Sequence, residues 1–115
     1  MAHAKVRSGD HLPDVSGTEL RMVLSAQTGH VLVTLGRLPA MAGLPGVQQV
    51  LLADTDAAVV GFDAVVADPD QRAAARFGLT SGRIMVRPDG YIGAICDGHD
   101  DGPITAYQKL TTAAG

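Results

Sequence analysis

The sequence predicts an α/β fold in which a central mixed sheet of four to five strands ends in a C-terminal β-hairpin and a final helix. Two observations favour this class. Short apolar runs of strand length alternate with helical patterns, which is typical of a sheet with a parallel core. Near the C-terminus, two strand-like segments flank Pro88-Asp89-Gly90, which suits a type I turn with a glycine bulge and therefore an antiparallel hairpin.

Length and composition bound the domain organisation. The 115 residues suffice for one domain with a single core. Residues 1–8 are polar and predict a flexible lead-in, and residues 9–115 predict a single domain. The net charge of −3 gives no electrostatic footprint for nucleic acid. The apolar runs are too short to span a membrane, and the N-terminus lacks the apolar core of a signal peptide, so we expect a cytoplasmic protein.

The N-terminal half predicts one helix and the first strands. Residues 9–15 should be extended, since Pro13 disfavours helix before it. A short helix should follow from Ser16 up to Gly29, and residues 31–36 form an almost continuous apolar run, as in a central strand covered on both faces. Residues 38–46 hold two prolines and two glycines, which would break any helix there. Residues 47–53 and 62–67 are the next extended segments.

The next segment has unusually complete helix signals. Asp68 suits an N-cap, Pro69 suits the first helical position, and Gln71 has the spacing of a capping box. Phe77 lies on the apolar face of this helix, and Gly78 can adopt the left-handed conformation that ends it.

The C-terminal third predicts the hairpin and the last helix. Residues 83–87 and 91–96 are its two strands, and Pro103 opens a helix that runs to Ala114. The inner face of that helix should carry Ile104, Tyr107, Leu110 and Thr111. We expect the core to include Val33, Leu35, Leu52, Phe77 and Val86. This order of elements predicts a thioredoxin-like α/β sandwich with residues 31–36 at its centre.

Four segments carry a resemblance to a known family, namely GDHLPDV, HVLVTLG, ADPDQRAAARFGL and above all RIMVRPDGYIG. In this order they resemble the C-terminal thioredoxin-like domain of FAD-dependent aromatic-ring hydroxylases, the flavin monooxygenases of the phenol hydroxylase and polyketide hydroxylase type. The resemblance covers residues 7–113. It implies a redox-inactive accessory module that serves packing or subunit contacts, with no catalytic residue and no cofactor of its own.

The resemblance also implies partners. In this family the FAD site and the substrate pocket lie mostly in N-terminal domains, and this chain has no G-x-G-x-x-G motif after a strand. FAD is therefore expected only in a parent enzyme. The expected partners are flavoenzyme N-terminal domains or a second subunit, with a homodimer as a further option; the chain would be a domain of a larger enzyme or a stand-alone relative.

A second resemblance, to peroxiredoxins, rests on GD-x-L-P-D-V and DPDQRAAARFGL. Those proteins need a thiolate near the end of the loop after the first central strand, where a helix N-terminus activates it. Residues 36–42 contain no Cys, Ser or Thr, and Thr80-Ser81-Gly82 replaces the cis-proline that thioredoxins carry before the hairpin. The alternative function is thus a small thiol oxidoreductase that uses Cys96, although its position in a strand predicts an inert thiol.

The remaining polar residues give two weaker candidates. Arg37, Arg83 and Arg87 could contact an anion or a partner carboxylate. The dense polar group Asp97, His99, Asp100 and Asp101 has oxygen ligands for a hard cation, but it precedes Pro103 and is better explained by capping of the last helix, so no metal site is expected. A binding module without enzyme chemistry is the third functional class.

Overall fold

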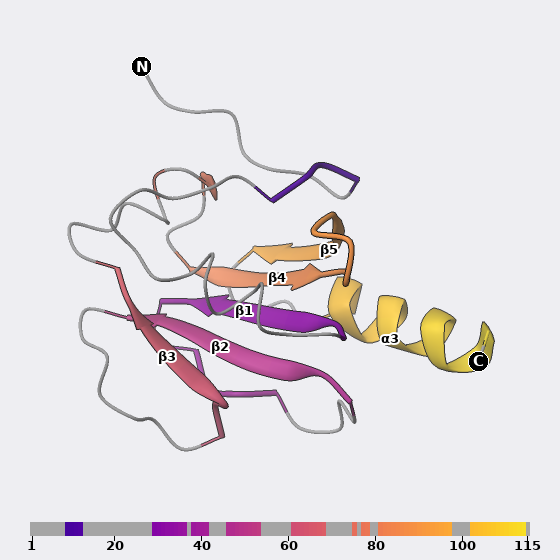
Figure 1. Ribbon diagram of the computed structural model, residues 1–115, viewed down its shortest axis with the longest axis horizontal. Coiled ribbons are helices and arrows are strands. Elements are labelled where there is room, and N and C mark those ends of the chain that lie inside the picture. The colour runs from indigo at the N-terminus through magenta and orange to yellow at the C-terminus, as the bar shows by residue number, and fades with distance from the viewer. Residues whose placement is uncertain are drawn as a thin grey trace.

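The computed structural model describes residues 9–12, 29–36, 38–41, 46–53, 61–68, 75, 77–78, 81–97 and 102–114. Within these ranges the elements are β1 (Val31–Leu35), β2 (Gln48–Ala53), β3 (Ala64–Ala67), β4 (Gly82–Val86), β5 (Ile92–Asp97) and helix α3 (Gly102–Ala114) (Figure 1). The expected helix between residues 16 and 29, the lead-in 1–8 and Arg37 lie outside the described residues.

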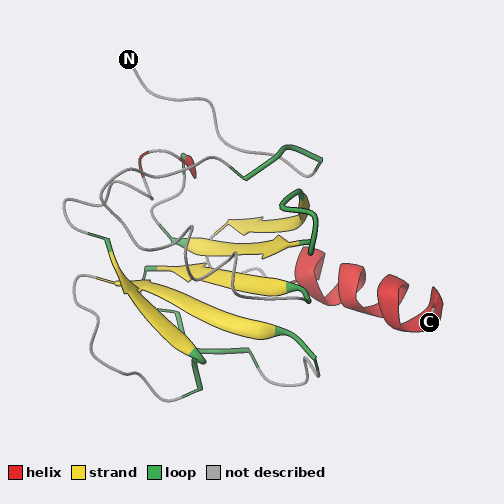
Figure 2. Ribbon diagram, viewed as in Figure 1, coloured by secondary structure: helices red, strands yellow, loops and turns green. Residues whose placement is uncertain are grey.

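The five strands form one mixed sheet in the order β3-β2-β1-β4-β5, so β1 lies at its centre. Strands β1, β2 and β3 run parallel, whereas β4 pairs antiparallel with β1 and β5 antiparallel with β4. Figure 2 shows the strands side by side, with the C-terminal helix beyond the hairpin end of the sheet. The prediction of an α/β fold with a mixed sheet, a late hairpin and a final helix is confirmed.

The sheet is buried on both faces along its centre, because all five residues of β1 are buried. Alternate residues point to opposite faces of a strand, so Val33 and Leu35 share one face and Leu32 and Thr34 the other. The first face packs into the larger core cluster, which includes Leu12 and Phe77. The five residues expected in the core are all buried there: Val33, Leu35, Leu52, Phe77 and Val86.

On the second face, α3 packs against the hairpin strands β5 and β4. Ile104 is fully buried against Leu32, Met85 and Cys96, and Tyr107 packs against the same cluster. The expected inner face of the helix is thereby confirmed for Ile104 and Tyr107, whereas the side chains of residues 110 and 111 lie outside the described part of the chain.

The hairpin has the predicted turn. The N–H of Gly90 donates to the carbonyl of Arg87 at 2.9 Å, and the N–H of Arg87 donates to the carbonyl of Tyr91 at 2.8 Å. Gly90 has φ +87°, the left-handed value that the bulge position requires. The register then shifts between Met85 and Val86, which leaves Gly93 as an additional residue on β5.

The end of the predicted 68–78 helix is visible in the described residues. Ala75 and Phe77 are helical, and the N–H of Gly78 donates to the carbonyl of Ala75 at 3.3 Å. Gly78 has φ +73°, as a left-handed helix end needs. In the described part of the chain, no helix has the length and apolar character that crossing a membrane would require.

Candidate functional site

The carboxyl end of β1 is the candidate site, because ligands in open α/β sheets bind beyond the carboxyl ends of the strands at the point where the strand order reverses. β1 is such a point, since β2 and β3 lie on one side of it and β4 and β5 on the other. The chain leaves β1 through Gly36, which has φ +82° and passes so close to Ser81 that an added Cβ would lie 2.9 Å from the Ser81 Oγ. We call residues 38–41, which follow, the β1 loop.

Gln49 of β2 fixes the far end of the β1 loop. Its side chain accepts a hydrogen bond from the N–H of Met41 at 2.9 Å and donates one to the Met41 carbonyl at 2.6 Å. Gln49 is itself buried, and its backbone is tied to Asp63: its N–H donates to Asp63 Oδ2 at 2.7 Å, and its carbonyl accepts from the N–H of Asp63 at 2.8 Å. Both main-chain groups of Met41 are therefore satisfied by one side chain.

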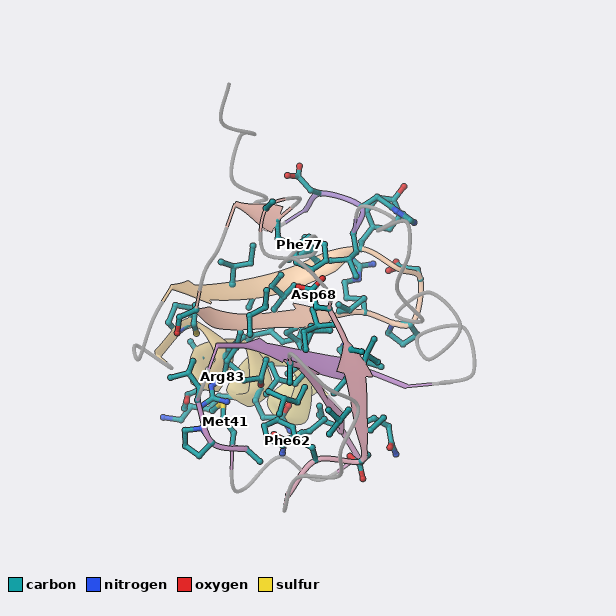
Figure 3. All side chains as sticks on the ribbon, turned by 90° about the vertical axis from the view of Figure 1, so that its left-hand side faces the viewer. Met41, Phe62, Asp68, Phe77 and Arg83 are labelled. Carbon is teal, nitrogen blue, oxygen red and sulfur yellow. The ribbon has the colours of Figure 1, made fainter. Side chains whose placement is uncertain are left out.

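Arg83 of β4 fixes the middle of the same loop. Its Nη1 donates to the Pro39 carbonyl at 2.6 Å and to Thr34 Oγ1 at 3.2 Å. The side chain comes from a residue that is only 3 % exposed, so this guanidinium lies inside the fold rather than at its surface. In the view of Figure 3, Arg83 and Met41 lie on one side of the sheet and Phe77 and Asp68 on the other. The loop is thus held from two neighbours of β1, one on each side.

The β1 loop carries no group that could attack a substrate. Its residues are Leu38, Pro39, Ala40 and Met41, none of which has a nucleophilic, acidic or basic side chain. Leu38 is buried and Ala40 and Met41 are partly buried. Hydrogen bonds from Gln49 and Arg83 go to the loop backbone, so these polar side chains hold the chain in place. The arrangement is suited to rigidity rather than to covalent catalysis.

Cys96 lies on the same face of the sheet, beneath α3. It is 1 % exposed, is not in a disulfide, and belongs to the cluster around Leu32 and Ile104. In the hairpin register it stands directly opposite Arg83. Its position inside a strand agrees with the sequence-based expectation, and its burial closes it to a dissolved reagent in this conformation.

The arginines expected to share a contact are separated by the structure. Arg83 faces inward near the start of β4, whereas Arg87 follows its last residue and forms an exposed ion pair with Asp89 at 2.6 Å. Arg37 lies outside the described residues, as do residues 98–101 and the side chain of Asp97. Among the described residues, no group of three or more acidic, histidine or cysteine side chains could hold a metal ion.

Sequence reasoning missed the polar side chains that hold the β1 loop. Thr34 and Gln49 are buried; Thr34 interrupts the apolar strand VLVTL, and Gln49 directly precedes the apolar residues of QQVLLA. For Thr34, the lone polar residue within an apolar run was the available signal, because a buried polar group requires a hydrogen-bond partner.

Two histidines that the sequence leaves scattered pair with the only two tyrosines in the chain. His30 Nε2 lies 2.9 Å from the Tyr107 hydroxyl, which joins the start of β1 to α3. The rings of His11 and Tyr91 meet edge to face, with centroids 5.1 Å apart. We interpret both pairs as packing contacts, because each joins an aromatic ring to a histidine at the boundary of the sheet.

Comparison with known proteins adds no assignment: the sequence matches no protein-family model and no curated protein.

Proposed function

We propose that this chain is a redox-inactive thioredoxin-like accessory module, similar to the C-terminal domain of FAD-dependent aromatic-ring hydroxylases, that serves packing or subunit contacts. The observation that carries the proposal is the β1 loop, whose backbone is fixed by Gln49 and Arg83 and whose side chains offer no nucleophile.

The topology supports the fold part of this proposal. The parallel strands β2 and β1, the antiparallel hairpin β4–β5 beside them, and a helix packed on the hairpin are the elements that a thioredoxin-like sandwich requires. The core residues Val33, Leu35 and Phe77 bury the sheet face opposite α3, so that face too is part of the interior.

The β1 loop supports the functional part. A thiol enzyme of this architecture needs a cysteine after the central strand, near a helix N-terminus that stabilises the thiolate. Here that stretch holds Leu38 to Met41, and the only cysteine of the chain is buried in β5. A loop held by buried polar side chains also keeps one shape, which lowers the entropy cost of docking against another protein surface.

The proposed partners are the N-terminal domains of a flavoenzyme or a second subunit, in the cytoplasm. FAD would belong to the parent enzyme, because this sequence has no dinucleotide-binding motif and few aromatic residues to line a flavin pocket.

The proposal is tested by three assays on the purified chain. We expect no peroxide consumption and no insulin reduction above the buffer background, and FAD binding no tighter than the micromolar range. The Cys96→Ser variant is the matched control. Turnover that disappears in this variant, or a submicromolar flavin titration, would overturn the redox-inactive assignment.

The accessory role needs a positive test as well. The reading frame or its immediate neighbours should encode an FAD-binding monooxygenase domain, and that domain, co-expressed with this chain, should co-purify with it. Absence of such a domain, or failure of the two to associate, would contradict the flavoenzyme part of the proposal while leaving the redox-inactive part intact.

The alternative is a thiol oxidoreductase that uses Cys96, and one observation favours it: a buried guanidinium stands opposite this thiol in the sheet. Labelling of Cys96 with a thiol reagent distinguishes the accessory module from the thiol oxidoreductase. Slow labelling that needs denaturant would support the structural role, whereas fast labelling of the folded chain would support the thiol enzyme.

A further inference from the structure

Residues 9–12, which we call the strap, lie along the outer edge of β5 beside the hairpin turn. The N–H of Gly9 donates to the Ile92 carbonyl at 2.8 Å, and the N–H of Ile92 donates to the Asp10 carbonyl at 2.8 Å. The N–H of Leu12 donates to the Gly90 carbonyl at 3.0 Å. The strap is therefore a short antiparallel addition to the sheet, centred on the pairing of His11 with Tyr91 (Figure 1).

Little of the strap is buried. Leu12 is its only buried residue and enters the larger core cluster, whereas Gly9, Asp10 and His11 are exposed. The His11 ring lies over Gly90, where an added Cβ would come within 2.9 Å of its Nε2, and it meets the Tyr91 ring edge to face. Segments with few buried contacts open at a lower free energy than the whole fold.

Release of the strap would leave unpaired main-chain groups on β5 and an empty position in the core. The Ile92 N–H and the carbonyls of Gly90 and Ile92 would lose their partners, and the site of Leu12 in the core would be empty. An exposed strand edge is a template for pairing with another chain. The sequence that restores every lost contact is the strap itself, and a second copy of the chain supplies an identical one.

We propose that the strap is an exchangeable edge strand, through which two copies of this chain form a symmetric dimer by each placing its strap on the β5 of the other. The contacts in the dimer are those seen within one chain, so exchange costs no interaction at the strap. Within one chain the strap competes at an effective concentration on the order of millimolar, so the dimer should become substantial only near that protein concentration. This inference does not depend on the redox-inactive assignment.

The pairing of His11 with Tyr91 provides a direct reporter. The main-chain bonds flank this pair at Asp10 to Ile92 and Leu12 to Gly90, which defines the close, non-hydrogen-bonded type of antiparallel pair. Its Cα separation of roughly 4.5 Å suits a disulfide. The variant His11→Cys, Tyr91→Cys, Cys96→Ser should therefore form an intrachain bond when the strap is in place and an interchain bond when it is exchanged.

The reduced variant is equilibrated over a range of concentrations, oxidised with diamide and separated on a non-reducing gel. We expect almost only intrachain product at about 10 µM and an interchain dimer that grows into a major species near about 1 mM. The two single-cysteine variants in the Cys96→Ser background measure random disulfides. Adding Leu12→Ala should leave the equilibrium dimer fraction unchanged, because both forms lose the same contact, while it speeds exchange more than about tenfold.

Three results would overturn the exchange proposal. The first is intrachain product alone at every concentration, with and without Leu12→Ala. The second is a dimer fraction no higher than in the single-cysteine controls. The third is failure of both disulfides to form, which would contradict the pairing of His11 with Tyr91 itself.

Discussion

Arg83 lies near the start of β4 and Arg87 directly follows its end, and the two side chains have opposite surroundings. Arg83 is 3 % exposed and donates to Thr34 and to the Pro39 carbonyl. The Arg87 side chain is 48 % exposed and pairs with Asp89, which is 45 % exposed. The same residue type, four positions apart, thus holds the β1 loop from inside the fold at one end and a solvated turn at the other.

Exposure to water decides how much each arginine contributes to stability. The Pro39 carbonyl and Thr34 depend on Arg83, and a buried polar group that loses its partner costs about 1–3 kcal/mol. An exposed ion pair contributes only about 0–1 kcal/mol, because water competes for both charges. Four substitutions should therefore lower the free energy of unfolding by amounts that decrease from the buried anchors to the exposed ion pair.

Arg83→Met should have the largest effect. It removes the donor to the buried Thr34 hydroxyl and to the part-buried Pro39 carbonyl, so we expect a loss of about 2–3 kcal/mol in the free energy of unfolding. Urea denaturation followed by circular dichroism measures it. Arg83→Lys is the matched control, since an ammonium lacks the planar fork that reaches two acceptors and should recover only part of the loss. A change below about 1 kcal/mol for Arg83→Met would refute the buried-anchor role.

Gln49→Leu tests the other anchor of the β1 loop. The N–H and carbonyl of Met41 would both lose their partner, which should cost about 2 kcal/mol. Gln48→Leu, at the partly exposed neighbouring position, is the control and should cost about 0.5 kcal/mol or less. Hydrogen exchange of the Met41 amide should accelerate only in the first variant, and unchanged protection there would argue against the interpretation.

The sheet was predictable from sequence and the loop anchors were not. Apolar runs predict the strands, and Pro88-Asp89-Gly90 predicts the turn, because each of these signals lies within a few consecutive residues. The role of Arg83 depends on Pro39 and Thr34, which the topology brings to it from distant positions. An arginine in a strand more often faces water, so the sequence grouped Arg83 with Arg87 as a surface contact. Only the register, which places Arg83 opposite Thr34 on the α3 face, shows it to be buried.

Gly93→Ala tests steric packing at the hairpin, where Gly93 of β5 lies against the ring of Tyr107. An added Cβ would lie 2.6 Å from Cζ of Tyr107, so the ring must move or the bulge must shift. We expect a cost of about 1–2 kcal/mol in thermal or urea unfolding. In a Tyr107→Ala background the clash is gone, and the same substitution should cost little. An equal loss in both backgrounds would show that the bulge, not the ring, requires glycine.

Arg87→Ala should have the smallest effect, about 0.5 kcal/mol or less, because both partners of its ion pair are solvated. Asp89→Ala should cost more, about 1 kcal/mol, since Asp89 also accepts from the N–H of Tyr91 at 3.1 Å and so supports the turn. Raising the salt concentration to 1 M should shrink the Arg87 effect and leave most of the Asp89 effect, because screening weakens an exposed ion pair more than a hydrogen bond to the backbone. If Arg87→Ala proved as damaging as Arg83→Met, burial would not be what distinguishes the two ends of β4. The turn would then depend on its ion pair rather than on the backbone bonds of Gly90 and Arg87.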